Sequence, residues 1–224
     1  ATVSGNMVTL TGVGTVVLAA NQAGNTNYNS ATEVTTSFAV SKGIPVINVL
    51  PTASPILFGQ ALSNATLSGG SASVAGGFAF TNPTTAPSAG TSTHEVTFTP
   101  SDASNHHSAT ANVSVTVAKA TPVVTWNAPA SISYGTALSG AQLNASASVN
   151  GSFSYTPVSG TVLGAGNQTL SAVFTPADVV NYNTTNKTVV LGVTKATQTI
   201  SGVTAALSKV VGAVPYWLNA SVTS

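Results

Sequence analysis

The stretch Val113-Ser114-Val115-Thr116-Val117-Ala118-Lys119-Ala120 decides the fold, because it carries both a strand pattern and a repeat. Apolar and polar side chains alternate over 113–117, which is typical of a half-buried β-strand. Related stretches occur at 37–43 (Ser-Phe-Ala-Val-Ser-Lys-Gly) and at 190–196 (Val-Leu-Gly-Val-Thr-Lys-Ala). Their lysines are 77 and then 76 residues apart: Lys42, Lys119 and Lys195. The chain therefore contains a repeated unit of about 76 residues that ends in a strand.

Two further markers return at the same spacing. Residues 98–102 (Phe-Thr-Pro-Ser-Asp) recur as 174–178 (Phe-Thr-Pro-Ala-Asp), and 58–62 (Phe-Gly-Gln-Ala-Leu) recur as 134–138 (Tyr-Gly-Thr-Ala-Leu). We therefore predict four parts: the C-terminal part of a repeat at 1–43, complete repeats at 44–120 and 121–196, and the N-terminal part of a repeat at 197–224. The two partial repeats together nearly make up one unit.

Composition excludes several classes of protein. Charged residues make up 4% of the 224 residues, whereas an ordinary soluble domain carries about 25%. A net charge of +1 and the absence of Arg leave no basic surface for nucleic acid. The absence of Cys excludes disulfides, Cys-based zinc sites and thiol nucleophiles. No apolar run of 18 residues occurs, so we predict no membrane insertion.

Strand patterns cover the chain, and helical periodicity is missing. Phe78 and Phe80 flank Ala79, and many such short runs are separated by turn residues, among the 20 Gly and 11 Pro. This pattern predicts an antiparallel β-sandwich with about six strands in each unit. Short segments that contain Pro join the units at 42–45 and 119–122, and such segments limit hinge motion. We therefore expect an all-β chain of tandem sandwich repeats in an extended array.

An acidic residue precedes an aromatic residue by four positions at the start of the last strand. Asp178 and Tyr182 form this pair in 121–196, while 1–43 has Gly24 at the position of the acid. A Tyr at such a corner turns its hydroxyl to upstream backbone, and an Asp accepts turn amides. His takes the position of Tyr in 44–120, so the predicted structural corner residues are Tyr28, Asp102, His106, Asp178 and Tyr182.

These motifs together resemble the tandem bacterial surface repeats of the Ig-like and MBG type. The resemblance rests on Tyr134-Gly135-Thr136, the Phe-Thr-Pro-x-Asp block, Asn27-Tyr28-Asn29 and the Val-x-Lys-Ala junction, and it covers essentially the whole chain. It implies Ig-like sandwiches in a long, secreted protein at the bacterial cell surface, where such domains serve as stalks or adhesive modules. It carries no catalytic residue.

Four side chains form the one cluster that could ligate a metal or transfer protons: His94, Glu95, His106 and His107. The alternative is that they are structural repeat positions that have drifted, since His106 aligns with Tyr182. We favour this alternative and predict no catalytic, cofactor or metal site.

A covalent crosslink is a second chemical hypothesis. A Lys–Asn isopeptide bond requires a nearby acid, and each complete repeat has a junction lysine and a corner acid: Lys119 with Asp102, and Lys195 with Asp178. Capping of the turn by the acid is the simpler interpretation, and it is the one that we adopt.

Aromatic residues and glycine-rich loops offer a ligand-binding alternative. Trp126, Tyr134, Tyr155 and Trp217 could stack on a sugar or could fill the core, and we favour the core. The loops 69–73 and 160–164 could grip a ligand.

The sequence thus predicts a structural, non-enzymatic repeat segment of a bacterial extracellular fibre, stalk or adhesin. Its expected partner is the chain itself, through neighbouring repeats and through head-to-tail complementation of the partial repeats at its ends. The alternative is an adhesin module that binds a surface glycan or a host or partner protein. Nucleic acid and cofactors are not expected.

Overall fold

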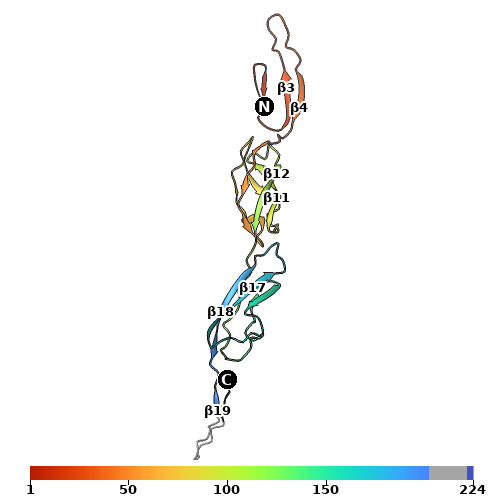
Figure 1. The fold of residues 1–224 in the computed structure, drawn as a ribbon. Helices are drawn as coiled ribbons and strands as arrows, with labels where there is room; N and C mark the ends of the chain where they lie inside the picture. The colour runs from red at the N-terminus through yellow and green to blue at the C-terminus, as the bar shows by residue number, and fades with distance from the viewer. Residues whose placement is uncertain (202–220, 224) are drawn as a thin grey trace, which may run out of the picture. The chain divides into compact units, whose positions relative to one another are not determined.

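The computed structural model describes residues 1–201 and 221–223, and this part of the chain is all-β (Figure 1). It has no α-helix; its one helical turn is the 3-10 turn η1 (Leu62–Asn64). The all-β prediction is confirmed. The chain divides into two compact units, Ala1–Ala120 and Thr121–Ser224. This division falls at one of the predicted repeat boundaries, and the finer four-part division stays a prediction.

The first unit contains two antiparallel hairpins followed by a larger group of strands. The hairpins are β1 (Thr2–Ser4) with β2 (Met7–Thr9), and β3 (Gly14–Ala20) with β4 (Val34–Val40). The strands that follow are β5 (Ile47–Val49), β6 (Thr52–Ala53), β7 (Ile56–Leu57), β8 (Leu67–Ser68), β9 (Ser71–Ala72), β10 (Gly76–Phe80), β11 (Gly90–Pro100) and β12 (Ala109–Ala118).

The second unit begins with a group of six strands and ends with one antiparallel pair. Its strands are β13 (Val124–Thr125), β14 (Ile132–Ser133), β15 (Ser146–Ala147), β16 (Gly151–Thr156), β17 (Gly166–Pro176), β18 (Thr185–Thr194), β19 (Thr199–Ser201) and β20 (Ser221–Thr223). Residues 44–120 thus contain eight strands and 121–196 contain six, whereas about six were predicted for each.

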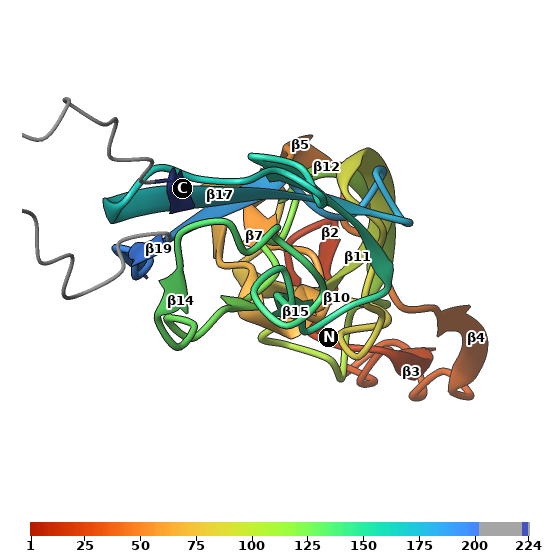
Figure 2. The same cartoon turned by 60° about the horizontal axis from the view of Figure 1, so that its bottom comes forward.

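Each unit is built on a four-stranded sheet with the same strand order. The order is β10-β11-β12-β7 in the first unit and β16-β17-β18-β14 in the second. A long antiparallel hairpin forms the centre of each sheet, and Figure 2 draws β17 as the longest arrow of the second unit. The registers also agree, because Gly90 lies opposite Val117 and Gly166 lies opposite Val193.

The sheets are not purely antiparallel, so that part of the prediction is wrong. β7 pairs parallel with β12 through Ile56 and Val117, and β14 pairs parallel with β18 through Ile132 and Val193. A parallel neighbour requires a long connection, and the other strands of the unit provide it. In chain order, β7 and β14 are the first strands of their sheets and β12 and β18 are the last. Each first strand therefore forms an edge of its sheet, beside the last strand.

The apolar residues of the alternating strands form one core in each unit. In β12, Val113, Val115 and Val117 are buried, and they pack with Ile56 and Leu62. The core of the second unit contains Trp126, Leu138, Leu163, Leu170, Ala172, Val189, Leu191 and Val193. These side chains come from both the sheet and the segments that cover it, as in a sandwich.

At one edge of each sheet, a pair of phenylalanine rings lies against a glycine. The rings of Phe78 and Phe98 are 5.1 Å apart, and those of Phe153 and Phe174 are 4.9 Å apart. A Cβ atom at Gly76 would overlap the ring of Phe98. Gly151 has the same relationship to Phe174, so both sheets require glycine at this position.

Candidate functional site

The turn that follows β11 is closed by the side chain of Asp102. Its Oδ1 accepts the backbone N–H of Asn105 at 3.2 Å, and its Oδ2 accepts the side-chain amide of Asn105 at 2.7 Å. After β17, Asp178 accepts the same two donors from Asn181 at 3.1 Å and 2.8 Å. We call each of these pairs an Asp–Asn clasp. It fixes the direction in which the chain enters the last strand.

Sequence reasoning singled out the two acids and missed their partners, Asn105 and Asn181. Asn follows Asp by three residues in both repeats. This spacing is the signal that could have identified them, because Asp and Asn side chains bond to turn backbone close to themselves in sequence.

The clasp lowers the pKa of Asp102 below its ordinary value of 3.8. The main cause is the side-chain amide of Asn105, which donates to the carboxylate. Desolvation of the carboxyl raises the pKa, while the backbone N–H of Asn105 and the nearby His106 lower it further. The carboxylate is therefore ionised at neutral pH, and its bonds to Asn105 are charge-assisted.

The aromatic corner positions take up equivalent places in the two turns. The backbone N–H of His106 donates to the carbonyl of Asp102 at 3.1 Å, and that of Tyr182 donates to the carbonyl of Asp178 at 3.1 Å. The Nδ1 atom of His106 lies 3.3 Å from the Asp102 carbonyl oxygen. Both side chains are half-buried, so His replaces Tyr without a change of backbone.

The predicted corner role of Tyr28 is wrong. Its side chain is 76% exposed, so it does not anchor a crossover. The turn is closed instead by Asn25, whose Oδ1 accepts the backbone N–H groups of Asn27 and Tyr28 at 2.8 Å and 3.0 Å. Asn25 lies one residue after Gly24, which stands at the position that Asp178 holds in 121–196.

The clasp of Asp102 and Asn105 also holds the preceding part of the chain. Asn105 Oδ1 accepts the backbone N–H of Val13 at 2.9 Å, and its carbonyl oxygen accepts the N–H of Gly43 at 2.9 Å. The carbonyl of Gly43 in turn accepts the N–H of His107 at 2.9 Å. One turn of residues 44–120 therefore bonds to two separate segments of residues 1–43.

Lys42 contributes to the same junction. Its Nζ donates to the carbonyl of Ala103 at 2.6 Å, inside the turn that the clasp closes. In the second unit, Asn183 stands at the position of His107, and its Nδ2 donates to Thr121 Oγ1 at 3.1 Å. The segments that follow Lys42 and Lys119 thus lie beside the turns closed by Asp102 and Asp178, respectively.

Lys119 and Lys195 do not meet the corner acid of their own repeat. Lys195 follows the end of β18, whereas Asp178 lies in the turn before the start of that strand. Ten residues of strand separate the two positions by roughly 30 Å. The same holds for Lys119 and Asp102 at the two ends of β12. The isopeptide hypothesis for these pairs is therefore wrong. Lys195 instead lines a shallow hollow beside the exposed ring of Tyr134.

The histidines do not converge on a metal site in the part of the chain that the structure describes. There, no group of three or more His, Cys, Asp or Glu side chains is placed to hold a metal ion. His94 Nε2 lies 2.8 Å from Ser92 Oγ on β11, and His106 belongs to the corner turn.

Two of the candidate sugar-binding aromatics lie in the core. Trp126 is buried, donates from Nε1 to the carbonyl of Gln142 at 3.0 Å, and packs edge-on against Tyr155. The hydroxyl of Tyr155 accepts the N–H of Ala145 at 2.9 Å. Tyr134 lies apart at the surface, and Trp217 lies outside the described residues.

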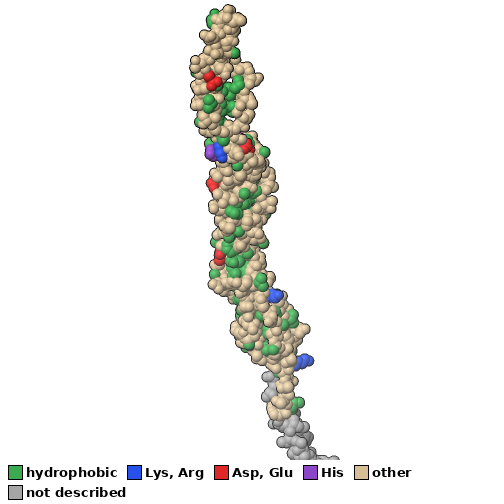
Figure 3. Space-filling view, turned by 180° about the vertical axis from the view of Figure 1, so that it is seen from behind, with side chains coloured by type: hydrophobic (Ala, Val, Ile, Leu, Met, Phe, Trp, Pro, Cys, Tyr) green, Lys and Arg blue, Asp and Glu red, His purple; other side chains and the backbone are tan. Residues whose placement is uncertain are grey.

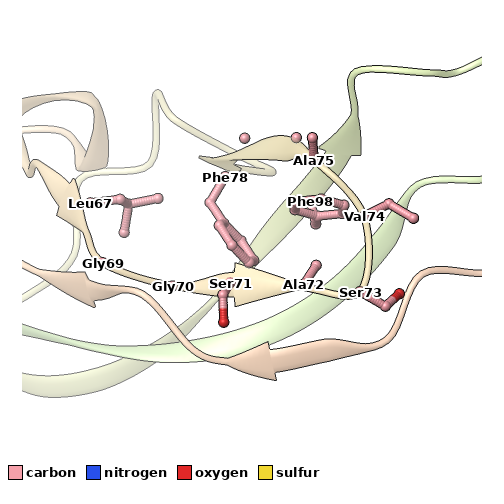
Figure 4. A pocket seen from close by; sticks show the side chains of 12 residues that line it. Leu67, Gly69, Gly70, Ser71, Ala72, Ser73, Val74, Ala75, Phe78 and Phe98 are labelled. Carbon is pink, nitrogen blue, oxygen red and sulfur yellow. The ribbon is translucent and has the colours of Figure 1, made fainter.

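The two candidate ligand loops differ. Residues 69–73 form one wall of an open hollow of about 520 Å³, with the ring of Phe78 pointing toward this wall and Phe98 beside it (Figure 4). Residues 160–164 pack onto their own unit instead, since Leu163 is buried and Gly160 N–H donates to the carbonyl of Leu138 at 2.8 Å.

No family model matches the chain, and no curated protein matches it. Among the described residues, no helix has the length and apolar character needed to cross a membrane.

Proposed function

We propose that the chain is a structural, non-enzymatic segment of a bacterial extracellular fibre, stalk or adhesin, built from tandem Ig-like sandwich repeats of about 76 residues. The sequence resemblance supports the setting. Support for a mechanical role comes from one observation, the parallel pairing of the first and last strands of each four-stranded sheet.

Parallel pairing of these strands makes a unit resist tension along the chain. In the first sheet the N–H of Phe58 donates to the carbonyl of Ala118 at 2.8 Å, and in the second the N–H of Tyr134 donates to the carbonyl of Thr194 at 2.8 Å. A pull toward the two chain ends moves parallel neighbours in opposite directions along their axes. The pull therefore loads the hydrogen bonds together in shear instead of opening them one after another, as suits a stalk or fibre.

Forced unfolding of single molecules held by their two ends tests this proposal. We expect two unfolding steps of similar length, each releasing the roughly 60 residues between the paired strands, which is about 20 nm of chain. Gradual extension without discrete steps would contradict a mechanical role.

A ligand-binding adhesin module is the second candidate, and the hollow beside Phe78 favours it. The glycine-rich loop 69–73 forms one wall of this hollow, and the rings of Phe78 and Phe98 line it, so an apolar or aromatic surface is available to a ligand. Binding to a panel of immobilised glycans, compared between the chain and an Ala72→Trp variant, whose added ring would fill the hollow because Ala72 points toward Phe98 (Figure 4), tests this candidate. Equal binding by both, or none by either, would contradict it.

A further inference from the structure

The β3–β4 hairpin corresponds to the central hairpins of the two four-stranded sheets. All three begin at a glycine with positive φ, which is +125° at Gly14, +124° at Gly90 and +116° at Gly166. Gly14 lies opposite Val40, as Gly90 lies opposite Val117 and Gly166 opposite Val193. Side chains of the three hairpins can therefore be compared position by position.

The core-facing side of β3–β4 is open in this chain. Phe38 lies opposite Val16 and takes the position of Val115 in β12 and Leu191 in β18. Val115 and Leu191 are both 0% exposed, whereas Phe38 is 39% exposed. Val16, Leu18 and Val40 share its face, because residues opposite or two apart point to the same side of a sheet. We call these four side chains the open face; Figure 3 shows hydrophobic side chains at the surface of the N-terminal part of the chain, to which this hairpin belongs.

The segments 44–120 and 121–196 show what covers such a face. In the second unit, Leu170, Leu191 and Val193 pack with Trp126, which follows β13, and with Ala145, which precedes β15. The covering layer therefore includes the strand pair β13–β15, in which Val124 lies opposite Ala147.

The same covering pair is present once more, near residue 200. β19 pairs with β20, and Ile200 lies opposite Val222 as Val124 lies opposite Ala147 and Ile47 lies opposite Ala72. Ile200 is 69% exposed. The described residues thus include a central hairpin with an exposed apolar face and a covering pair with an exposed isoleucine.

We propose that the open face of β3–β4 binds the β19–β20 pair of a second copy of this chain, so that copies join head to tail. This inference rests on the proposed structural function and names its partner. The contact is heterologous, and such contacts extend into filaments where the rotation does not close a ring. Neither β3–β4 nor β19–β20 contains a charged residue. Association is therefore expected to change little with salt, because it depends on apolar burial and strand pairing.

Complementary variants test the proposal. Phe38→Lys places a charge on the open face, Ile200→Lys places one on the covering pair, and Val17→Lys is the matched control on the outer side of β3, where Val17 is 62% exposed. All three have the same net charge. Sedimentation velocity is measured between about 1 µM and about 500 µM, the range in which contacts of moderate affinity form.

We expect the chain and the Val17→Lys variant to grow beyond 22.0 kDa with concentration, and each of the other two variants alone to stay monomeric. An equimolar mixture of Phe38→Lys and Ile200→Lys should form a dimer and stop there, because each copy retains one intact side of the contact. A chain that is monomeric throughout, or a mixture that forms no dimer, would overturn the proposal. The force steps expected of the two complete units do not depend on association, so their presence in a monomeric chain would leave the structural function standing.

Discussion

Asp102 and Asn105 lie 2.7 Å apart, Oδ2 to Nδ2, and the side-chain oxygen of Asn105 accepts the N–H of Val13 at 2.9 Å. The carboxylate orients the amide of Asn105, and the amide in turn fixes a residue 92 positions earlier in the chain. Asn105 therefore couples the corner turn to the preceding segment.

Substitution of Asn105 by Ala should release this segment. Val13 and Gly43 should exchange their amide hydrogens faster by about tenfold, since the clasp bond and the bond to Val13 are lost, and a net hydrogen bond is worth about 1 kcal/mol. Hydrogen exchange followed by NMR measures this change. Asn112→Ala, an exposed position on β12, is the control. Unchanged exchange at Val13 would show that Asn105 does not hold the segment.

The clasp should weaken in acid. Because the pKa of Asp102 is lowered in the folded chain, ionisation of its carboxyl stabilises the fold. That contribution is complete above the unfolded pKa, near 3.8, and is lost as the pH falls through the lower folded value. Melting temperatures between pH 2 and pH 6 should therefore fall on the acidic side more steeply for the native chain than for Asp102→Asn. Parallel curves for the two proteins would contradict this expectation.

Alternation and repetition predicted much of the fold from the sequence alone. Val113, Val115 and Val117 are buried, as expected when apolar and polar side chains alternate along a strand with one face in the core. The parallel edge strands escaped prediction, because two-residue strands such as Ile56–Leu57 are too short to show a period and are positioned by tertiary pairing. Asn105 escaped prediction for a related reason, since its bond to Val13 joins residues far apart in sequence.

The role of Tyr28 was mispredicted because the sequence identifies an aromatic position without showing whether anything covers it. Tyr182 has the same Asn-Tyr-Asn context and is half-buried, while Tyr28 is exposed. The difference lies in the surroundings of the side chain, which local sequence does not contain.

The glycine at position 76, which lies against the ring of Phe98, should be important for the stability of the fold. Gly76→Ala would place a Cβ against the ring of Phe98 and the carbonyl of Thr99, so we expect a loss of about 1–3 kcal/mol in the free energy of unfolding. Gly77→Ala is the matched control, because nothing lies within 4 Å of its Cβ. Urea denaturation compares the two variants. Equal stability would show that the sheet edge yields to the added methyl group.

The parallel edge bond should set the force at which a unit yields. Tyr134→Pro removes the N–H that donates to the carbonyl of Thr194 at 2.8 Å, whereas Tyr134→Ala keeps it. Since Tyr134 is exposed, loss of the ring alone should cost little. In single-molecule pulling, Tyr134→Pro should move one of the two steps to lower force and leave the other unchanged. The unaltered first unit then serves as an internal standard in every trace. If Tyr134→Ala lowered the force as much as Tyr134→Pro, the resistance would come from side-chain packing instead of the hydrogen bond between β14 and β18. If neither variant moved a step, the sheared edge would not be the site at which the unit gives way.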